Sequence, residues 1–535
     1  MEENCGVVWK YSYSIYLIFA FLFITINHIS NMKKFLLFSL FIFLCFNFTD
    51  ICSQTDKLIH HPKREFRGAW IQCVNGQFMG KSSEQIRSML YKQLDILQKA
   101  GINAIMFQVR PEGDALYYSS YEPWSRYLTG RQGMPPEDGW DPLAWMVEQC
   151  HDRGMECHAW INPYRMKTKG TKEMAITHTA ILHKDWIIRY GDLFILNPAL
   201  KESRNYTCLV IEDIINKYDV DGIHMDDYFY PYPEAGLTFN DEQFFKNDPR
   251  GFNNLADWRR DNVNLLIKDI HDMIRAKAPW VKFGISPFGI YRNDPNGQNS
   301  AYGSATRGLQ NYDNLYADVV KWQNEGWVDY LIPQIYWNIG TKVADYQILA
   351  HWWNDNCANR PIYIGQDVER TVKGVDPNDS TKNQMDSKYS IQRSLNNIHG
   401  SCQWYAAMVE ENPDGYRTAL ENIYHKYPAL QPSMPFIKNK PPKRPGRIKI
   451  TINGDITVLN WKHDRTRNEM KRAISYVVYD FPPGQIMDFE NPQFIKIITR
   501  NNSVAFKGDI FNHTIAVTAL DHLHNESKPR IVVMN

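Results

Sequence analysis

Residues 219–233, with the sequence DVDGIHMDDYFYPYP, decide the fold. The apolar run in this stretch ends abruptly in two adjacent carboxylates, Asp226 and Asp227. Successive side chains of a strand point to opposite faces, so at least one of the two carboxylates points inward at the C-terminal end of the strand. Enzymes built on parallel barrels carry their chemistry at that end. The stretch therefore predicts a buried barrel strand that opens onto an active site.

The residues that follow the two carboxylates are mostly aromatic, namely Tyr228, Phe229 and Tyr232. Aromatic side chains offer apolar ring faces with polar tips, which suits the mixed faces of a sugar. An Asp after a strand is also common as a helix N-cap or in a solvated loop, and such a structural role is expected for one of the pair. The pattern favours catalysis or substrate binding for at least one of Asp226 and Asp227.

Eight strand-like runs alternate with helix-like segments from Phe66 onward, which predicts a closed (β/α)8 barrel of the TIM type. The expected strands are Gly68 to Gln72, Ala104 to Val109, Glu156 to Ile161, Gly222 to Asp226, Val281 to Ser286, Tyr330 to Tyr336, Ile362 to Gly365 and Cys402 to Ala406. Helix starts are marked by Ser82 with Gln85, a capping box, and by Asp141 before Pro142.

The lengths of the connections support the barrel. Connections from helix to strand are very short, whereas those from strand to helix run over residues 110–140, 162–205, 227–254 and 287–312. Such long loops would gather on the C-terminal face of a barrel and form a deep cleft there. The alternative is an open doubly wound sheet, but the glycine-rich phosphate loop that such a sheet carries after its first strand is missing at residues 72–76.

The chain length of 535 residues predicts two domains. The first is the catalytic barrel over residues 64–430, and residues 431–446, rich in Pro, Lys and Arg, form a linker. Six strand-like runs without intervening helices follow over residues 447–535 and predict a small all-β sandwich that resembles a fibronectin type III module. Its expected role is spacing or packing.

The N-terminus holds two apolar segments. Residues 32–54 follow the pattern of a signal peptide, with a basic start, an apolar run and a cleavage zone near Cys52. Residues 1–31 are then an upstream extension or, alternatively, a membrane anchor. The folded part is predicted to be exported, to the periplasm, the cell envelope or the extracellular space. Lipidation at Cys45 or Cys52 is a minor alternative, because the expected small residues do not precede either cysteine.

Basic and acidic residues almost balance, giving a net charge of +1. The composition therefore indicates no nucleic-acid partner and no polybasic membrane surface, and a membrane contact is expected only through the signal or anchor segment. Six cysteines follow the signal without metal-binding spacing, and no metal or nucleotide cofactor is expected. A disulfide between Cys150 and Cys157 fits an oxidising compartment, although a chain of this length does not need one.

Seven strings in a fixed order carry a family resemblance: FRGAWIQ, FQVRPEGDALYYSS, HAWINPYR, ILNPAL, DGIHMDDYFYP, FGISPFGIYRN and PQIYWN. Over about residues 64–380 they resemble the glycosyl-hydrolase-like family ten of bacterial secreted proteins. The resemblance implies a barrel glycoside hydrolase with a polysaccharide substrate, and at least one family member acts on peptidoglycan glycan strands stripped of peptides. The family does not by itself fix the substrate of this chain.

Polar positions that match the family pattern follow five of the expected strands, and all are expected at the barrel mouth. They are Arg110 and Asp114; Asn162, Tyr164 and Arg165; His224, Asp226, Asp227 and Tyr228; Ser286 and Arg292; and Gln334, Tyr336 and Trp337. Glu112 stands where the family more usually has a small residue. It is interpreted as a solvated loop charge, with an accessory acid as the alternative.

Hydrolysis of a glycosidic bond needs one protonated and one ionised carboxyl group. We expect Asp226 to be the nucleophile or base, because the strand end holds it rigidly, and Asp227 or Asp114 to be its acid partner. If adjacent side chains diverge too far to act on one bond, Asp227 would bind a sugar hydroxyl or anchor its loop. Arg110 and Arg165 would hold a substrate carboxylate or neutralise the buried aspartates.

Two other functions stay open. A metal-dependent deacetylase or amidase would use His158 and His224 together with Asp226 and Asp227, and a glycan-binding protein would have lost catalysis. No pair of these ligands has diagnostic metal spacing, and a single strand histidine is more often a hydrogen-bonded core residue.

Overall fold

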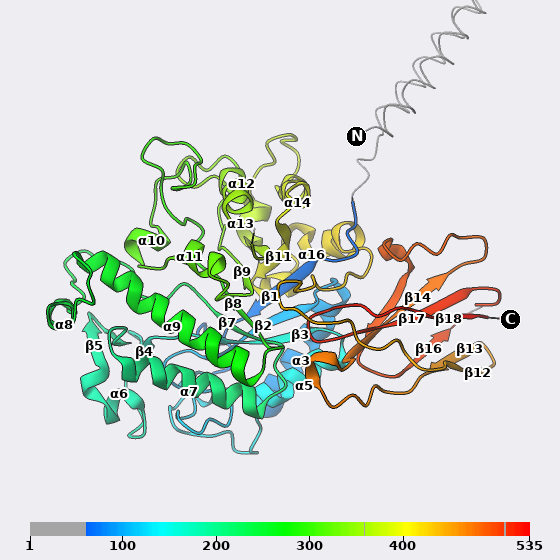
Figure 1. Cartoon of the computed structure of the whole chain (residues 1–535), viewed down its shortest axis with the longest axis horizontal. Coiled ribbons are helices and arrows are strands. Elements are labelled where there is room, and N and C mark those ends of the chain that lie inside the picture. The colour runs from blue at the N-terminus through cyan, green and yellow to red at the C-terminus, as the bar shows by residue number, and fades with distance from the viewer. Residues whose placement is uncertain (1–59, 358, 508–509, 535) are drawn as a thin grey trace, which may run out of the picture. The chain divides into compact units, whose positions relative to one another are not determined.

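Eight parallel strands close into a barrel in the computed structural model, which describes residues 60–357, 359–507 and 510–534 (Figure 1). Around the barrel they are β1 (Phe66–Ile71), β2 (Ala104–Arg110), β3 (Glu156–Ile161), β7 (Gly222–Met225), β8 (Lys282–Ile285), β9 (Tyr330–Leu331), β10 (Ile362–Asp367) and β11 (Ile398–Trp404), and β11 pairs with β1. The predicted (β/α)8 barrel is confirmed, and the doubly wound alternative is wrong because the sheet has no open edge.

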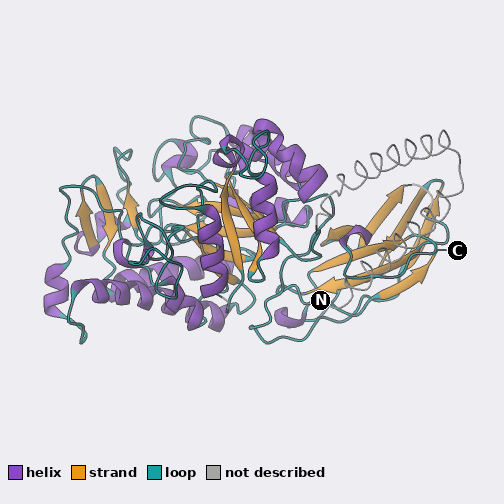
Figure 2. Ribbon diagram, turned by 90° about the horizontal axis from the view of Figure 1, so that it is seen from above, coloured by secondary structure: helices purple, strands orange, loops and turns teal. Residues whose placement is uncertain are grey.

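Helices lie between successive strands and surround the barrel (Figure 2). The main ones are α3 (Ser83–Lys99), α5 (Pro142–Asp152), α7 (Lys201–Lys217), α9 (Leu255–Lys277), α11 (Val319–Asn324), α12 (Tyr346–Asn356), α14 (Met385–Ser394) and α15 (Ala406–Glu411). The expected starts are confirmed: Ser82 and Gln85 form a capping box at α3, and Asp141 caps α5 with Pro142 as its first residue.

The long loops after the strands have structure of their own. The loop after β3 holds a three-stranded antiparallel sheet, which the sequence did not predict, of β4 (Arg165–Lys167), β5 (Ile187–Tyr190) and β6 (Leu193–Leu196). Short helices lie in the same and other loops: α4 (Arg126–Thr129), α6 (Thr179–Leu182), α8 (Glu242–Asn247), α10 (Asn311–Asn314) and α13 (Val368–Lys373). Because every one of these loops follows a strand, they all gather at the C-terminal end of the barrel.

The barrel interior is filled largely by aromatic side chains, among them Phe66, Trp70, Trp160 and Tyr330. Glycines on the strands make room for these rings. A Cβ at Gly284 would lie 2.0 Å from the Tyr330 ring. The interior is therefore a packed core rather than a pore, and only its C-terminal end is left for a site.

The C-terminal part is a sandwich of two antiparallel sheets. The first contains β12 (Lys449–Asn453), β13 (Ile456–Asn460) and β16 (Ser503–Lys507), and the second, in spatial order, β15 (Ile495–Thr499), β14 (Ser475–Phe481), β17 (Thr514–Leu520) and β18 (Arg530–Val533). Strand β18 adds to the six expected ones. The three-plus-four arrangement is compatible with fibronectin type III, and that assignment stays a prediction. The described residues from 61 onward form one compact unit.

The predictions for residues 1–31 and 32–54 lie outside the described residues. Within the described part, no helix combines the length and apolarity needed to span a bilayer. Its six cysteines are all free thiols, so the Cys150–Cys157 disulfide considered above is not formed, and all of them except Cys208 are buried.

Candidate active site

Asp226 and Asp227 follow β7 directly, at the C-terminal end of the barrel. Both residues are almost fully buried, with exposed fractions of only 3% and 2%. Two adjacent buried carboxylates are costly to ionise together, because each loses hydration and repels the other. The pKa of each is raised, in both cases mainly by burial. We therefore expect the pair to share a proton near neutral pH.

The neighbours of Asp226 are donors that favour its ionised form. Trp160 Nε1 donates to Asp226 Oδ2 at 3.1 Å, and Asn162 Nδ2 donates to the same oxygen. The backbone N–H of Tyr228 donates to Oδ1 at 3.2 Å. The guanidinium of Arg165 lies 3.9 Å from Oδ2 and lowers the pKa of Asp226 against the effect of burial. Asp226 is thus the carboxyl group of the pair that is better held as an anion.

The surroundings of Asp227 favour its protonated form. Burial and then the charge of Asp226 raise the pKa of Asp227 to about 7. The Tyr232 hydroxyl donates to Asp227, and Gln334 makes a second side-chain hydrogen bond to it. Both donors are neutral, so they offset burial less than a guanidinium does. Surroundings that separate the pKa values of two carboxyl groups in this way suit one group to act as a base and the other as an acid.

Arg165 and Tyr228 form a wall beside the two carboxyl groups. The Tyr228 side chain is 38% exposed, and it stacks on Tyr232 with ring centroids 5.4 Å apart. The Arg165 guanidinium lies 4.2 Å from the Tyr228 ring centroid. The Nε of Arg165 is buried and has no hydrogen-bond partner among the described residues. The wall therefore places a partly exposed tyrosine next to a guanidinium cation.

Two further residues stand at the C-terminal ends of β10 and β11 and were not singled out from the sequence. Trp404 is partly buried, and its ring centroid lies 5.9 Å from those of Trp70 and Tyr336. Asp367 caps α13 by accepting from the Arg370 backbone N–H at 2.8 Å, and burial raises its pKa. Both strands were predicted, so their polar and aromatic residues at the C-terminal ends could have been recognised as candidates for the barrel mouth.

Three predicted substrate contacts lie beneath the mouth rather than in it, which corrects their expected position. Arg110 is fully buried, and its guanidinium donates to Glu122 at 2.6–3.0 Å, so its charge is already neutralised. Tyr164 is fully buried in the core outside the strands. His224 is fully buried inside the barrel, where Trp70 Nε1 donates to its Nε2 at 3.1 Å. These three side chains support the site instead of lining it.

Asp114, the other predicted acid, lies in the loop after β2 and is fully buried. It accepts from Gln132 Nε2 at 2.9 Å and from the backbone N–H of Glu112 at 3.1 Å. Burial raises its pKa to about 7. Glu112 is buried as well and pairs with Arg126 at 3.0 Å, so its interpretation as a solvated loop charge is wrong. These two carboxyl groups hold the loop together, and their bonding partners differ from those of Asp226 and Asp227.

The remaining predicted substrate contacts do not all lie at the barrel mouth. Gln334 bonds to Asp227, and the partly exposed Tyr336 packs on Trp404, so both belong to the mouth. Trp337 packs edge-on against Phe288, with ring centroids 5.5 Å apart. Arg292 is engaged in the loop after β8, where it pairs with Asp313 at 2.8 Å and lies 3.9 Å from the Tyr302 ring.

A metal-dependent reaction would need His, Cys, Asp or Glu side chains grouped around one point. Among the described residues, no group of three or more His, Cys, Asp and Glu side chains is arranged to hold a metal ion. His158 and His224 instead share Tyr330, whose hydroxyl lies 2.8 Å from His158 Nδ1 and 3.2 Å from His224 Nδ1.

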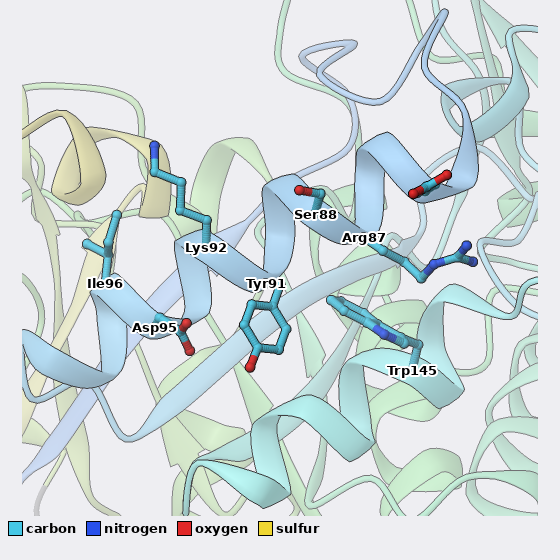
Figure 3. A pocket seen from close by; sticks show the side chains of 8 residues that line it. Arg87, Ser88, Tyr91, Lys92, Asp95, Ile96 and Trp145 are labelled. Carbon is cyan, nitrogen blue, oxygen red and sulfur yellow. The ribbon is translucent and has the colours of Figure 1, made fainter.

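A separate shallow groove of about 600 Å³ lies on the outside of the barrel between α3 and α5 (Figure 3). Tyr91 and Lys92 of α3 and Trp145 of α5 contribute to its lining. The groove is built from the outward surfaces of helices and contains none of the residues that surround Asp226. It is therefore distinct from the candidate active site.

The barrel is closed, and two adjacent buried carboxyl groups follow a strand at its C-terminal end, where barrel hydrolases carry their chemistry. Residues 65–384 match the model of the family Glycosyl hydrolase-like 10, and the chain belongs to that family. The resemblance found in the sequence is thereby confirmed.

Relatives of known name extend this match. The chain is 38% identical to the glycosyl hydrolase YngK of Bacillus subtilis strain 168, over 87% of this chain and 92% of that protein. It is 40% identical to the glycosyl hydrolase DigH of Escherichia coli K12, over 58% of this chain and 75% of that protein. The solved glycoside hydrolase domain of PgaB from Bordetella bronchiseptica aligns with 69% of this chain and 100% of that domain, at 11% identity and a TM-score of 0.44. The family and the two named relatives support a glycoside hydrolase.

Proposed function

We propose that this protein is an exported glycoside hydrolase that cleaves O-glycosidic bonds of a polysaccharide with two carboxyl groups. Asp226 acts as the nucleophile or base, and Asp227 acts as the acid. The observation that carries the proposal is the division of the pair: Asp226 accepts from Trp160 and Asn162 beside Arg165, whereas Asp227 has only neutral donors and a pKa of about 7. Export rests on the signal-like pattern of residues 32–54.

The chemistry follows from these protonation states. Asp227 donates its proton to the glycosidic oxygen, so that the leaving sugar departs as an alcohol. Asp226 attacks the anomeric carbon or removes a proton from the attacking water, and the positive charge that develops on the sugar ring is stabilised by its carboxylate. Transfer of the proton leaves Asp227 ionised, while Asp226 loses its own charge by bonding to the anomeric carbon or by taking the proton of the water. The pair therefore carries one negative charge before and after the step, and Arg165, 3.9 Å from Asp226, stabilises that charge on Asp226 before the step.

For the substrate we propose a glycan that carries carboxylate groups, with peptide-free peptidoglycan glycan strands as the leading candidate. In such strands the lactyl carboxylate of muramic acid is free. The Arg165 side chain is 15% exposed and lies against the partly exposed Tyr228. A guanidinium in this position can bind a carboxylate through its terminal nitrogens while the exposed part of Tyr228 contacts the sugar.

The test is a product assay of residues 55–535 on peptide-free peptidoglycan glycans and on a panel of neutral and acidic polysaccharides. Release of fragments that contain muramic acid supports the proposal. Release from another polysaccharide only would retain the reaction and change the substrate. Binding without any product would favour a glycan-binding protein, and loss of activity with a chelator would favour the metal-dependent deacetylase or amidase.

The pH dependence of the proposed reaction follows from the two carboxyl groups. Asp227 must be protonated to act, and its pKa is about 7, so kcat/KM is expected to fall as the pH rises through about 7. Asp226 must be ionised, so kcat/KM is also expected to fall toward acid pH. A bell-shaped profile of kcat/KM from pH 3 to pH 10 checks this. A profile that stays flat from pH 6 to pH 9 would contradict the role of Asp227.

Replacement of Arg165 by Ala is expected to discriminate between substrates. It should raise KM for a carboxylate-bearing glycan about tenfold relative to a neutral glycan of the same length, because a charge-assisted hydrogen bond is lost. Any loss in kcat caused by the missing charge near Asp226 should be similar for both substrates. Arg292→Ala is the matched control, because Arg292 already pairs with Asp313. Equal KM changes for both glycans in Arg165→Ala would remove the carboxylate contact from the proposal.

A further inference from the structure

The loop between β17 and β18 of the sandwich reaches the N-terminal end of the barrel. His524 of this loop places its Nε2 2.6 Å from Glu156, the first residue of β3. Both side chains are buried. Asp521 holds the loop in shape by accepting from the backbone N–H groups of Leu523 and Asn525, each at 2.9 Å. His524 itself has a φ of 57°, a left-handed conformation that side-chain-bearing residues adopt uncommonly.

A second sandwich residue holds the base of β7. Arg500, in the turn between β15 and β16, contacts Asp221 at 2.6 Å, and Asp221 directly precedes β7. Asp221 also accepts from the backbone N–H of Cys157 in β3 at 2.8 Å. The sandwich therefore holds the starts of the two neighbouring strands whose ends carry Asp226 and its donors.

A column of hydrogen bonds runs through the barrel interior from Trp70 to Glu156. The indole N–H of Trp70 can only donate, so the Nε2 of His224 accepts at 3.1 Å. The proton of neutral His224 is then assigned to Nδ1, which donates to Tyr330 Oη at 3.2 Å. The Tyr330 hydroxyl donates to His158 Nδ1 at 2.8 Å, and His158 Nε2 donates to Glu156 at 2.9 Å. One fixed donor thus sets every tautomer in the column.

The column ends on a carboxylate that is held as an anion from both domains. Burial alone would raise the pKa of Glu156, but Lys282 of β8 and His524 of the sandwich outweigh it and hold that pKa well below the usual value. The Nδ1 of His524 is buried and has no hydrogen-bond partner among the described residues, which is an energetic cost of this arrangement. The strands also make room for the column, because a Cβ at Gly222 would lie 2.5 Å from the His158 ring.

At its upper end the column supports the active site. His224 pairs in the sheet with Trp160, the residue that donates to Asp226, and it lies two residues before Asp226 on the same face of β7. We propose that His524 is a positioning residue for the active site. Through Glu156 it fixes the column that sets His224 and Trp160, so the C-terminal sandwich is a working part of the catalytic barrel rather than a spacer.

The first test is kinetic and rests on the proposed hydrolase activity. His524→Leu keeps the bulk and removes the donor, whereas His524→Gln keeps a side-chain N–H. We expect His524→Leu to lower kcat about tenfold with KM within about twofold, because a small displacement of the catalytic groups has effects of this size. His524→Gln should restore kcat to within about threefold of the wild type. The matched control is His522→Leu, since His522 of the same loop packs against Trp280 with ring centroids 5.9 Å apart.

The second test does not depend on any activity, so it separates failure of this proposal from failure of the proposed function. In nitrogen-15 spectra of histidine-labelled protein, His224 should show the Nδ1–H tautomer and His158 the Nε2–H tautomer. The His158 signals should shift in His524→Leu and not in His522→Leu. The proposal is overturned if the wild type shows the same tautomer for both residues, if His158 does not respond to His524→Leu, or if His524→Leu lowers only the melting temperature and leaves kcat unchanged.

Discussion

Replacement of Asp226 by Asn should lower kcat by at least about 10⁴-fold, because the loss of a catalytic nucleophile or base is of this order. Asn has nearly the same shape, but its amide can neither attack an anomeric carbon nor take a proton from water. The fold should persist, because the side-chain oxygen of Asn, placed where Oδ2 lies in Asp226, can still accept from Trp160 and Asn162, and only the bond from the Tyr228 N–H to Oδ1 is lost. Product release from the glycan that the wild type cleaves best is the measurement.

Asp367→Asn is the matched control for this variant, because Asp367 also stands at the end of a barrel strand. Asn is as good a helix N-cap as Asp, so α13 should keep its cap and kcat should stay within about threefold of the wild type. Retention of glycan binding by Asp226→Asn would show that the site is intact. A larger loss in Asp367→Asn than in Asp226→Asn would move the central carboxylate from β7 to β10.

The barrel was predictable because most of its strands contain a short apolar run. Strands covered on both faces need such runs, and the short helix-to-strand connections left few other topologies. The end of β7 could be predicted as well, since few purely structural roles explain two adjacent carboxylates directly after an apolar run. In contrast, β9 is only two residues long, Tyr330–Leu331, although a run to Tyr336 was expected. Beyond Leu331 the pairing continues only as isolated bridges, from Gln334 to Phe288 on one side and to Gly365 on the other, so the strand itself ends early.

The partners of the polar residues were not predictable in the same way. Arg110 ends β2, and Arg165 lies a few residues beyond β3, so the two look alike in the sequence, but Glu122 pairs with Arg110 and neutralises its charge. His224 and Asp226 point to the same face of the sheet, as expected, but His224 lies deeper in the barrel. There its two ring nitrogens are hydrogen-bonded to Trp70 and Tyr330. The contact between Glu156 and His524 joins residues 368 positions apart. Such contacts depend on how loops and domains close over the barrel, and no local pattern of residues encodes that.

Replacement of Asp227 by Asn is the second large effect that we expect. For a polysaccharide, kcat should fall about 10²-fold to 10⁴-fold, because a sugar leaves poorly without a proton from a general acid. For an aryl glycoside with an acidic phenol as leaving group, the fall should be much smaller, since that phenolate departs without a proton. The variant should also lose the fall of kcat/KM through about pH 7, because the group with that pKa is gone.

Asp114→Asn is the control that decides between the two predicted acids. Asp114 is equally buried, and its pKa is also about 7, so burial and titration alone do not distinguish it from Asp227. Asp114 holds its loop through bonds from Gln132 and from the Glu112 backbone, so Asp114→Asn should lower the melting temperature. Any loss of activity should then be the same for the aryl glycoside and for the polysaccharide. If Asp114→Asn instead spares only the aryl glycoside, Asp114 is the acid. Asp227 would then serve to hold Tyr232 and Gln334 in the barrel mouth, where Asp226 still acts.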